Sequence, residues 1–127
     1  MFVYFNPNPQ NKAVGDCTVR ALAKLLDVPW HEAYDALCDE GYLDGDMPSS
    51  NAVMSALLRK MGFRRRIVSN LCPTCYTLRD FVRDHPEGEC LVAFGNHVVT
   101  VVDGNYYDSW DSGSENPLYY YTKEDDE

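Results

Sequence analysis

The sequence has no long hydrophobic run and comparatively few positive charges. No segment of the chain approaches the roughly 18 consecutive apolar residues of a membrane-spanning helix. Lysine and arginine together number 11, against 20 aspartate and glutamate residues, and the formal net charge of the 127 residues is −9. Such a charge opposes binding to the phosphate backbone of nucleic acids. We therefore expect a protein that binds neither membranes nor nucleic acids.

A secretory signal and a regular cysteine framework are also missing. The stretch MFVYFNPNPQ has no basic flank before its short apolar run, and prolines follow at once, unlike a signal peptide. We therefore expect a cytoplasmic protein. The cysteines are odd in number and irregularly spaced, so we expect reduced thiols rather than disulfides. They are Cys17, Cys38, Cys72, Cys75 and Cys90.

Length and composition predict one domain over residues 1–127. The hydrophobic fraction is 45% and the aromatic fraction 13%, which is typical of a folded domain with a substantial core. Asparagine, proline and glycine are frequent in residues 1–15, and we expect an extended loop there. Residues 123–127, KEDDE, are expected to form an acidic flexible tail.

Helical periodicity dominates the first half of the chain, and the second half changes toward the alternation of strands. Apolar residues recur at helical spacing over 17–26, over 30–41 and in a third segment that Gly62 closes. Thr77 is a predicted N-cap of a short helix. The expected fold class is α+β, with N-terminal helices packed on a small C-terminal antiparallel β-sheet. The hairpin signal Asp103–Gly104 and other turn residues separate predicted strands at 63–68, 90–94, 97–102, 105–108 and 118–121.

A cysteine stands at the predicted start of the first helix, in the stretch GDCTVRALAKLL. The N–H groups of a first helical turn have no partners within the helix, and together with the helix dipole they stabilise a thiolate. Cys17 is therefore a candidate nucleophile, with a packed, unreactive cysteine as the alternative. Asp16 is a predicted N-cap whose charge would raise the thiol pKa. We expect Arg20, one turn later, to pair with Asp16 or with a strand-borne acid such as Asp111.

A histidine and an aspartate are predicted to lie close together on neighbouring strands. His97 begins one strand of the hairpin that turns at Asp103–Gly104, and Asp108 ends the other strand. Both residues lie near the open end of the hairpin. An aspartate at this place can hold the imidazole in the tautomer that a general base needs. Cys17, His97 and Asp108 thus offer a nucleophile, a base and an orienting group for thiol acyl transfer.

The stretches VGDCTVRA, GNHVVTVVDG and YYDSWD resemble the papain-like cysteine peptidase superfamily. The resemblance is to its small bacterial and phage-type members, similar in style to the domains that process bacteriocin leaders. In that superfamily the cysteine begins the central helix, and the histidine and an aspartate or asparagine lie on neighbouring strands. The order Cys17, His97, Asp108 matches, although the longer cysteine signature of the papain and cathepsin branch is absent. The resemblance implies a papain-like fold over nearly the whole chain and a hydrolase of peptide or amide bonds without a cofactor.

The resemblance also implies an oxyanion hole. Papain-like enzymes carry a glutamine or asparagine shortly before the cysteine, which makes Asn11 or Gln10 the candidate to assist the Cys17 N–H. The implied partner is a peptide or protein substrate. Trp110 is a candidate to line the substrate groove or to shield the Asp108–His97 pair from water, with core packing as the alternative. Peptidoglycan amidases of a related type would use the same triad.

Two other functions stay open. The same scaffold without catalytic activity would be a binding module, for example a phage or mobile-element protein that targets a host protein. The C-x-x-C pair of Cys72 and Cys75 can provide half of a zinc site or a redox pair, but the sequence has no second such pair. We therefore predict no metal site, and zinc binding by this pair is kept as an alternative.

Overall fold

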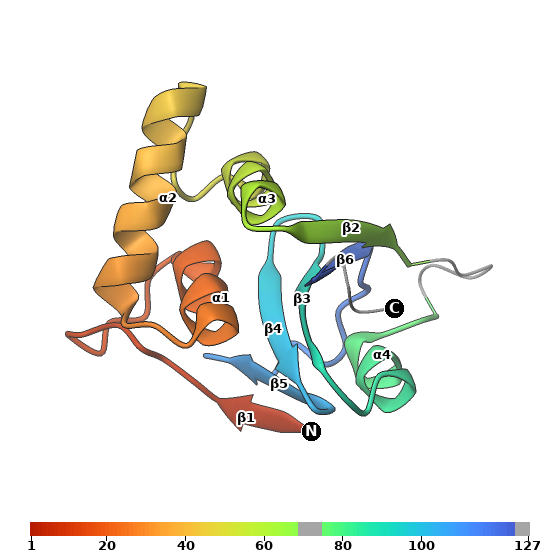
Figure 1. Ribbon diagram of the computed structural model, residues 1–127. Helices are drawn as coiled ribbons and strands as arrows, with labels where there is room; N and C mark the ends of the chain where they lie inside the picture. Colours follow the sequence, from red (N-terminus) through yellow and green to blue (C-terminus); the bar gives the residue numbers. More distant parts are fainter. Residues whose placement is uncertain (69–74, 124–127) are drawn as a thin grey trace.

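A computed structural model of the protein describes residues 1–68 and 75–123, which form an α+β structure (Figure 1). The described strands make one mixed sheet in the order β1-β5-β4-β3-β6-β2. The helices are α1 (Cys17–Leu26), α2 (Trp30–Asp44), α3 (Asn51–Lys60) and α4 (Leu78–Asp84). The strands are β1 (Phe2–Tyr4), β2 (Phe63–Ile67), β3 (Glu89–Ala93), β4 (Val98–Val102), β5 (Asn105–Asp108) and β6 (Tyr119–Lys123).

Helices cover both faces of the sheet. On strand β3, Leu91 and Ala93 belong to the core formed with α1, α2 and α3, whereas Cys90 and Val92 belong to the core formed with α4. This alternation is the two-residue period of a strand that is buried on both faces. Figure 1 shows α1, α2 and α3 on one side of the sheet and α4 on the other. The central strands are therefore held between two apolar layers.

Several predicted elements are confirmed with their boundaries. Helix α1 spans the predicted residues 17–26, and Thr77 caps α4 in a capping box with Asp80. The predicted turn at Asp103–Gly104 joins β4 and β5, with φ angles of 49° and 79°. Positive φ at both central residues is the geometry of a type I′ hairpin turn, which Asp-Gly pairs adopt readily. These elements carry local signals that do not depend on distant contacts.

The sheet is not purely antiparallel, which corrects the sequence-based prediction. Residues 2–4 form β1, which pairs in parallel with β5 from Phe2↔Tyr106 to Tyr4↔Asp108. The other described strand pairs are antiparallel. The prediction assigned residues 1–15 to a loop because asparagine and proline follow this short apolar stretch at once. The stretch becomes a strand through hydrogen bonds to a distant part of the chain, which local sequence does not report.

Two further boundaries differ from the prediction. Helix α2 continues past Gly41 and ends at Asp44, where Gly45 terminates it with a left-handed φ of 68°. Gly41 is buried inside the helix, where an added Cβ would lie 2.7 Å from the backbone oxygen of Asp46. Its small size therefore serves close packing and not helix termination. Lys123, predicted in the acidic tail, is the last residue of β6, and its ammonium lies 4.6 Å from the centre of the Phe63 ring.

The cysteines follow the expectation of reduced thiols only in part. Cys75 is disulfide-bonded. The prediction rested on the expected compartment, whereas a disulfide depends on the local approach of two sulfurs. Cys72 and the tail residues 124–127 lie outside the described residues. Among the residues that the structure describes, Cys17, Cys38 and Cys90 are free thiols.

No helix in the described part of the chain is long and apolar enough to span a membrane.

Gly41→Ala is expected to destabilise the protein by about 1–3 kcal/mol, because the added methyl group overlaps backbone that has little room to withdraw. Urea unfolding followed by circular dichroism measures the change. Gly15→Ala is the matched control, since no atom lies within 4 Å of its added Cβ. Equal stability of the two variants would contradict the packing role of Gly41.

Candidate active site

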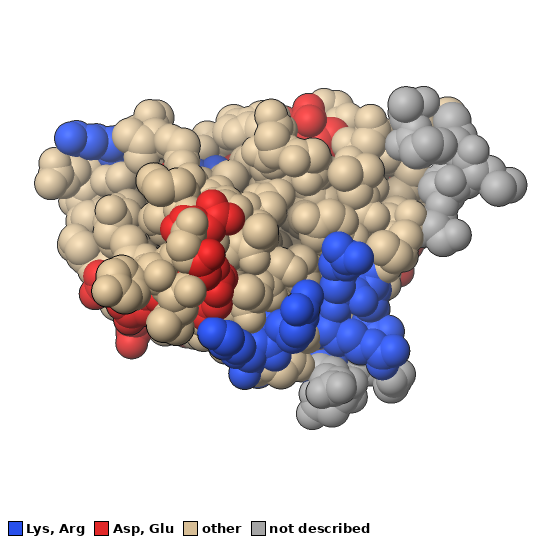
Figure 2. All heavy atoms as spheres, turned by 90° about the horizontal axis from the view of Figure 1, so that it is seen from above, with Lys and Arg blue, Asp and Glu red and all other residues tan. Residues whose placement is uncertain are grey.

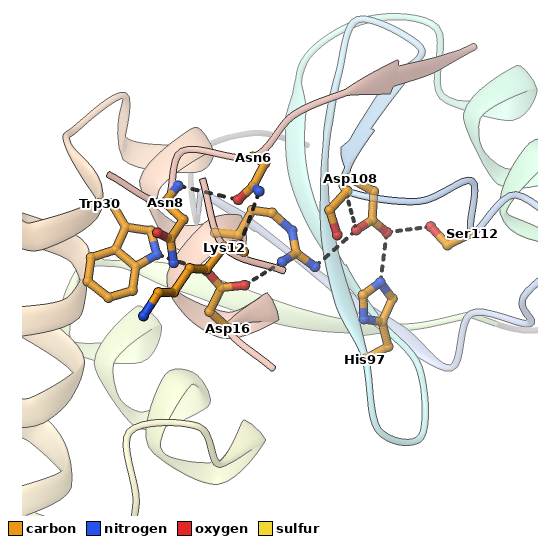
Figure 3. Close-up of polar contacts among 10 residues, drawn as sticks. Asn6, Asn8, Lys12, Asp16, Trp30, His97, Asp108 and Ser112 are labelled. Atoms are coloured by element: carbon orange, nitrogen blue, oxygen red, sulfur yellow. Dashed lines mark hydrogen bonds and ion pairs between the residues drawn. The ribbon is translucent and has the colours of Figure 1, made fainter. Parts of the chain in front are cut away.

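Cys17, His97 and Asp108 meet at one end of the sheet. Cys17 is the first residue of α1, His97 immediately precedes β4, and Asp108 is the last residue of β5. The imidazole Nε2 of His97 lies 2.7 Å from Oδ2 of Asp108 (Figure 3). The imidazole of His97 also acts on the Cys17 thiol, both as a hydrogen-bonding group and through its charge, and lowers the pKa of that thiol; Nδ1 is the ring nitrogen left for this interaction. The three side chains therefore form one row from thiol to imidazole to carboxylate.

Two tight turns place the histidine and the aspartate. The backbone N–H of Phe94 donates a 2.8 Å hydrogen bond to the backbone oxygen of His97 and closes the turn at Gly95–Asn96. This turn places His97 directly before β4. The type I′ turn sets the register between β4 and β5, in which Thr100 lies opposite Tyr107. The next pair in this register is Val99 and Asp108. Asp108 therefore lies diagonally across from His97 on the same face of the sheet, within side-chain reach.

Helix α1 is fixed to the same strand by a buried polar contact. The hydroxyl of Thr100 donates a 2.6 Å hydrogen bond to the backbone oxygen of Ala21. This contact and the apolar core hold the first turn of α1 beside β4. The Cys17 thiol there is half-buried, and the backbone N–H of Val98 acts on it as a hydrogen-bond donor that lowers its pKa. The sulfur thus has an imidazole and a backbone N–H as partners.

The surroundings of the Cys17 thiol favour its ionised form. Partial burial raises the pKa of Cys17, but the hydrogen bond and positive charge of His97 lower it, assisted by the Val98 N–H and the charge of Arg20. The net result is a pKa below the ordinary value of 9.0. Cys90 is the contrasting case, because burial alone raises its pKa to about 12.

The histidine is shifted in the opposite direction, toward its charged form. Burial lowers the pKa of His97, but hydrogen bonds with Asp108 and Cys17 and their negative charges raise it to about 9. Burial also raises the pKa of Asp108, whereas hydrogen bonds from His97 and Ser112 and the charges of His97 and Arg20 bring it below its ordinary value. These shifts favour an imidazolium beside a thiolate at neutral pH.

Asp108 is fully buried and accepts four hydrogen bonds. Its Oδ1 accepts from Arg20 Nη2 at 3.0 Å and from the Ser109 N–H at 2.8 Å. Its Oδ2 accepts from Ser112 Oγ at 2.6 Å in addition to the contact with His97. Four partners fill the accepting capacity of a carboxylate, so the buried charge is fully satisfied. Ser112 was not predicted as a site residue, and its only sequence signal is its place four residues after Asp108.

Arg20 connects Asp108 to Asp16 through a buried pair of salt bridges. Its Nη1 lies 2.6 Å from Asp16 Oδ1 and its Nη2 lies 3.0 Å from Asp108 Oδ1 (Figure 3). The other carboxylate oxygen of Asp16 accepts a 2.9 Å hydrogen bond from the Trp30 indole. Asp16 therefore occupies the predicted N-cap position without capping α1 through its side chain, because Arg20 and Trp30 engage both of its oxygens.

Arg20 pairs with Asp16 and with an acid on a strand, as expected. The strand acid is Asp108, whereas Asp111, which the prediction gave as an example, pairs with Arg79 at 3.2 Å. Asp16 was expected to raise the pKa of the neighbouring thiol. Its charge is instead paired with Arg20, and the net shift of the thiol is downward.

Trp110 lies beside the imidazole of His97. The centres of the two rings are 5.0 Å apart at an angle of 36°, and Trp110 remains 46% exposed. The Phe94 ring stacks with the same imidazole at 5.8 Å. These aromatic neighbours leave His97 only 8% exposed. The position of Trp110 fits a shielding role and a place on the wall of a groove, but not full burial in the core.

The two oxyanion-hole candidates, Asn11 and Gln10, have no part in the contacts among the three candidate catalytic residues. Asn11 and Gln10 are both exposed in the loop between β1 and α1. Backbone hydrogen bonds tie them to Asn8, one to its backbone oxygen and one to its side chain. Within residues 1–68 and 75–123, neither side chain forms a hydrogen bond with Cys17, His97 or Asp108. The α1 N-terminus beside the thiol has no side-chain cap, so its N–H groups are the donors that the geometry offers.

Of the C-x-x-C pair, Cys75 belongs to the described residues. Cys72 lies outside the described residues, and Cys75 is disulfide-bonded. Among the residues that the structure describes, no three histidine, cysteine or acidic side chains gather in an arrangement that could hold a metal ion.

Cys17 is expected to react with iodoacetamide faster than Cys38 at neutral pH, because a lowered pKa raises the fraction of Cys17 present as the reactive thiolate. His97→Ala should move the pH midpoint of Cys17 alkylation upward, since burial then acts on the thiol without the imidazolium. Mass spectrometry of tryptic peptides after timed labelling gives both rates. Labelling of Cys38 as fast as Cys17, or an unchanged midpoint in His97→Ala, would contradict the ion pair.

Arg20→Met is expected to destabilise the protein by about 3–5 kcal/mol, because it leaves two buried carboxylates without their cation. Arg83→Met is the control, since it removes an exposed pair with Asp80 that is worth at most about 1 kcal/mol. Urea unfolding of both variants measures the difference. A loss in Arg20→Met no larger than in Arg83→Met would show that the carboxylates find other partners.

Comparisons with known proteins place this chain in no family. Protein-family models, curated proteins and solved structures each gave no match.

Proposed function

We propose that the protein is a cysteine peptidase or amidase that hydrolyses a peptide or amide bond through Cys17, His97 and Asp108. The observation that carries this proposal is the 2.7 Å contact of His97 with a buried, fully satisfied carboxylate, together with the action of the same imidazole on the Cys17 thiol, whose pKa it lowers. A structural cysteine needs no such neighbours, and Cys90 in the same sheet has none that lowers its pKa. The proposed substrate is a peptide or protein, and the proposed location is the cytoplasm.

The reaction follows from the charge state of the pair. The Cys17 thiolate attacks the carbonyl carbon, and an S–C bond forms as the carbonyl π electrons move to oxygen. The imidazolium of His97 gives its proton to the leaving amine as the C–N bond breaks. Water then attacks the thioester while His97 accepts its proton, and the thiolate leaves with the carboxylic acid product released. No cofactor enters these steps.

Asp108 is proposed to keep His97 in the form that this sequence requires. Its Oδ2 accepts the Nε2 proton, so that Nδ1 faces the thiol and exchanges the mobile proton. Arg20 and Ser112 hold the carboxylate in place from behind. They touch neither the thiol nor the imidazole ring in any described hydrogen bond, and they are positioning residues.

The oxyanion is proposed to bind at the start of α1. The Cys17 N–H has no intrahelical partner, and the helix dipole favours negative charge at this place. A well-placed hydrogen-bond donor to a tetrahedral oxyanion lowers the activation barrier by about 3–4 kcal/mol. A second donor from Asn11 or Gln10 is implied by the resemblance alone, and it would require a movement of their loop toward the thiol.

A papain-like fold is proposed on the same grounds. A helix that begins with the candidate nucleophile packs on a strand that follows the histidine, and the aspartate ends the adjacent strand. The chain order of the three residues also matches. The parallel pairing of β1 with β5 adds a feature that the resemblance did not imply.

Cys17→Ala is expected to abolish peptide cleavage, because no second described thiol has an imidazole partner that lowers its pKa. The purified protein is incubated with a proteome-derived peptide mixture, and new peptide termini are identified by mass spectrometry. Cys38→Ala is the matched control and should retain full activity, since Cys38 takes no part in the row. Cleavage that persists in Cys17→Ala would refute the proposal. An inactive wild type with an unreactive Cys17 would favour the binding module.

A further inference from the structure

A pocket lies between helix α3 and the strands β6 and β2, away from the candidate active site. Its volume is about 380 Å³. One wall comes from a single side of the helix and the other from the sheet. The lining residues are Asn51, Ala52, Ser55, Ala56, Arg59, Arg65, Tyr119 and Tyr121.

Side-chain size and strand register explain why a hollow exists here. Residues 52, 55, 56 and 59 follow the three- and four-residue spacing of one helix face, and the first three are small. On the sheet, Arg65 pairs directly with Tyr121 and lies diagonally across from Tyr119. The small helix residues thus face a wall of long side chains, and space remains between them.

Two arginines converge on this pocket from different elements. Arg59 comes from the last turn of α3, and Arg65 comes from the middle of β2. Both side chains are exposed, and the Arg65 guanidinium lies 5.1 Å from the centre of the Tyr119 ring. The charges of both arginines act on the phenol of Tyr121 and oppose the rise of its pKa that burial causes. Two positive charges are therefore concentrated around one hydroxyl-lined hollow.

Arg59 and Arg65 have no carboxylate partner in the described part of the chain. Lys60, the neighbour of Arg59, is by contrast held by Glu40 at 2.8 Å. Arg64, on the same strand as Arg65, also forms no ion pair among the described residues, but it does not line the pocket. In a chain with a net charge of −9, two arginines without a carboxylate at one pocket are a local concentration of positive charge.

The face formed by α3 and β2 shows this charge separation directly. In Figure 2, lysine and arginine side chains gather in one band, and the acidic side chains visible on this face lie outside it. Two positive charges that line the same pocket repel each other, and an anion that binds between them relieves this repulsion. Guanidinium groups suit an oxyanion because they donate two parallel hydrogen bonds.

Hydroxyl groups add donors at the same place. The Tyr121 hydroxyl donates a 2.6 Å hydrogen bond to Ser55 Oγ. The Ser55 hydroxyl proton is then free to point into the pocket. The amide of Asn51 lines the same hollow and can donate as well. Charged and neutral donors together match a compact anion with several oxygens.

We propose that this pocket, with Arg59 and Arg65 as its charged residues, binds a phosphate monoester. A monoester carries a charge of about −1.5 to −2 at neutral pH and three acceptor oxygens. Two arginines balance that charge, whereas a carboxylate would leave one of them uncompensated. The volume exceeds that of a single phosphate group, so the ester can belong to a small molecule or to a phosphorylated side chain. This site is separate from the proposed catalytic function and does not depend on it.

Titration of the full chain with inorganic phosphate, at constant ionic strength, tests the proposal by ¹H–¹⁵N NMR. Saturable shifts are expected on the amides of Asn51, Ser55 and Tyr121, and sodium acetate should cause none at equal ionic strength. Arg59→Gln and Arg65→Gln should each weaken phosphate binding about tenfold or more, the range of a charge-assisted hydrogen bond. O-phosphoserine and a phosphoserine peptide, titrated in parallel, distinguish a small-molecule source from a side-chain source.

Arg64→Gln is the matched control. It removes the same charge from the same strand at an exposed residue that does not line the pocket. Equal weakening by Arg64→Gln and Arg65→Gln would mean general charge attraction and would overturn the proposal. Binding of acetate as tight as phosphate, or shifts spread over the surface, would overturn it too. The map of phosphate-induced shifts in the wild-type protein locates the binding site by itself. The proposal can therefore be tested even if one of the variants folds poorly.

Discussion

A carboxylate with no solvent exposure is the constraint around which one end of this structure is organised. An ionised aspartate inside a protein is tolerated only when hydrogen bonds and an opposite charge replace its water. Asp108 meets this requirement with donors from α1, from the segment after β5 and from the residue before β4. Separate parts of the chain must therefore come together at one point before this charge is stable.

The same requirement links the chemistry of the site to its architecture. The cation that balances Asp108 also balances Asp16, which leaves the start of α1 without a side-chain cap and its N–H groups available beside the thiol. The backbone of Asp108 accepts a 2.8 Å hydrogen bond from Phe5, so the chain after β1 is held at the same point. Stability and reactivity at this end of the molecule depend on the same few contacts.

Local features of the fold could be predicted from the sequence, and features that depend on distant contacts could not. The cap at Thr77, the hairpin turn at Asp103–Gly104 and the extent of α1 carry their signals within a few residues. The contact of His97 with Asp108 followed from the geometry of the hairpin, whereas the place of Cys17 beside them was implied by the resemblance. The partners of Arg20 depend on which acid the folded chain buries beside it, and β1 depends on a strand from the other half of the chain.

Parallel pairing of the first strand with the fifth has a consequence during synthesis. Residues 2–4 find their partners only after residue 108 has left the ribosome, and contacts of such sequence separation form late because loop closure is costly in entropy. Cys17 emerges from the ribosomal exit tunnel long before His97. The growing chain thus carries an ordinary, unactivated thiol, and the arrangement of charges that would make it nucleophilic arises only with the nearly finished fold.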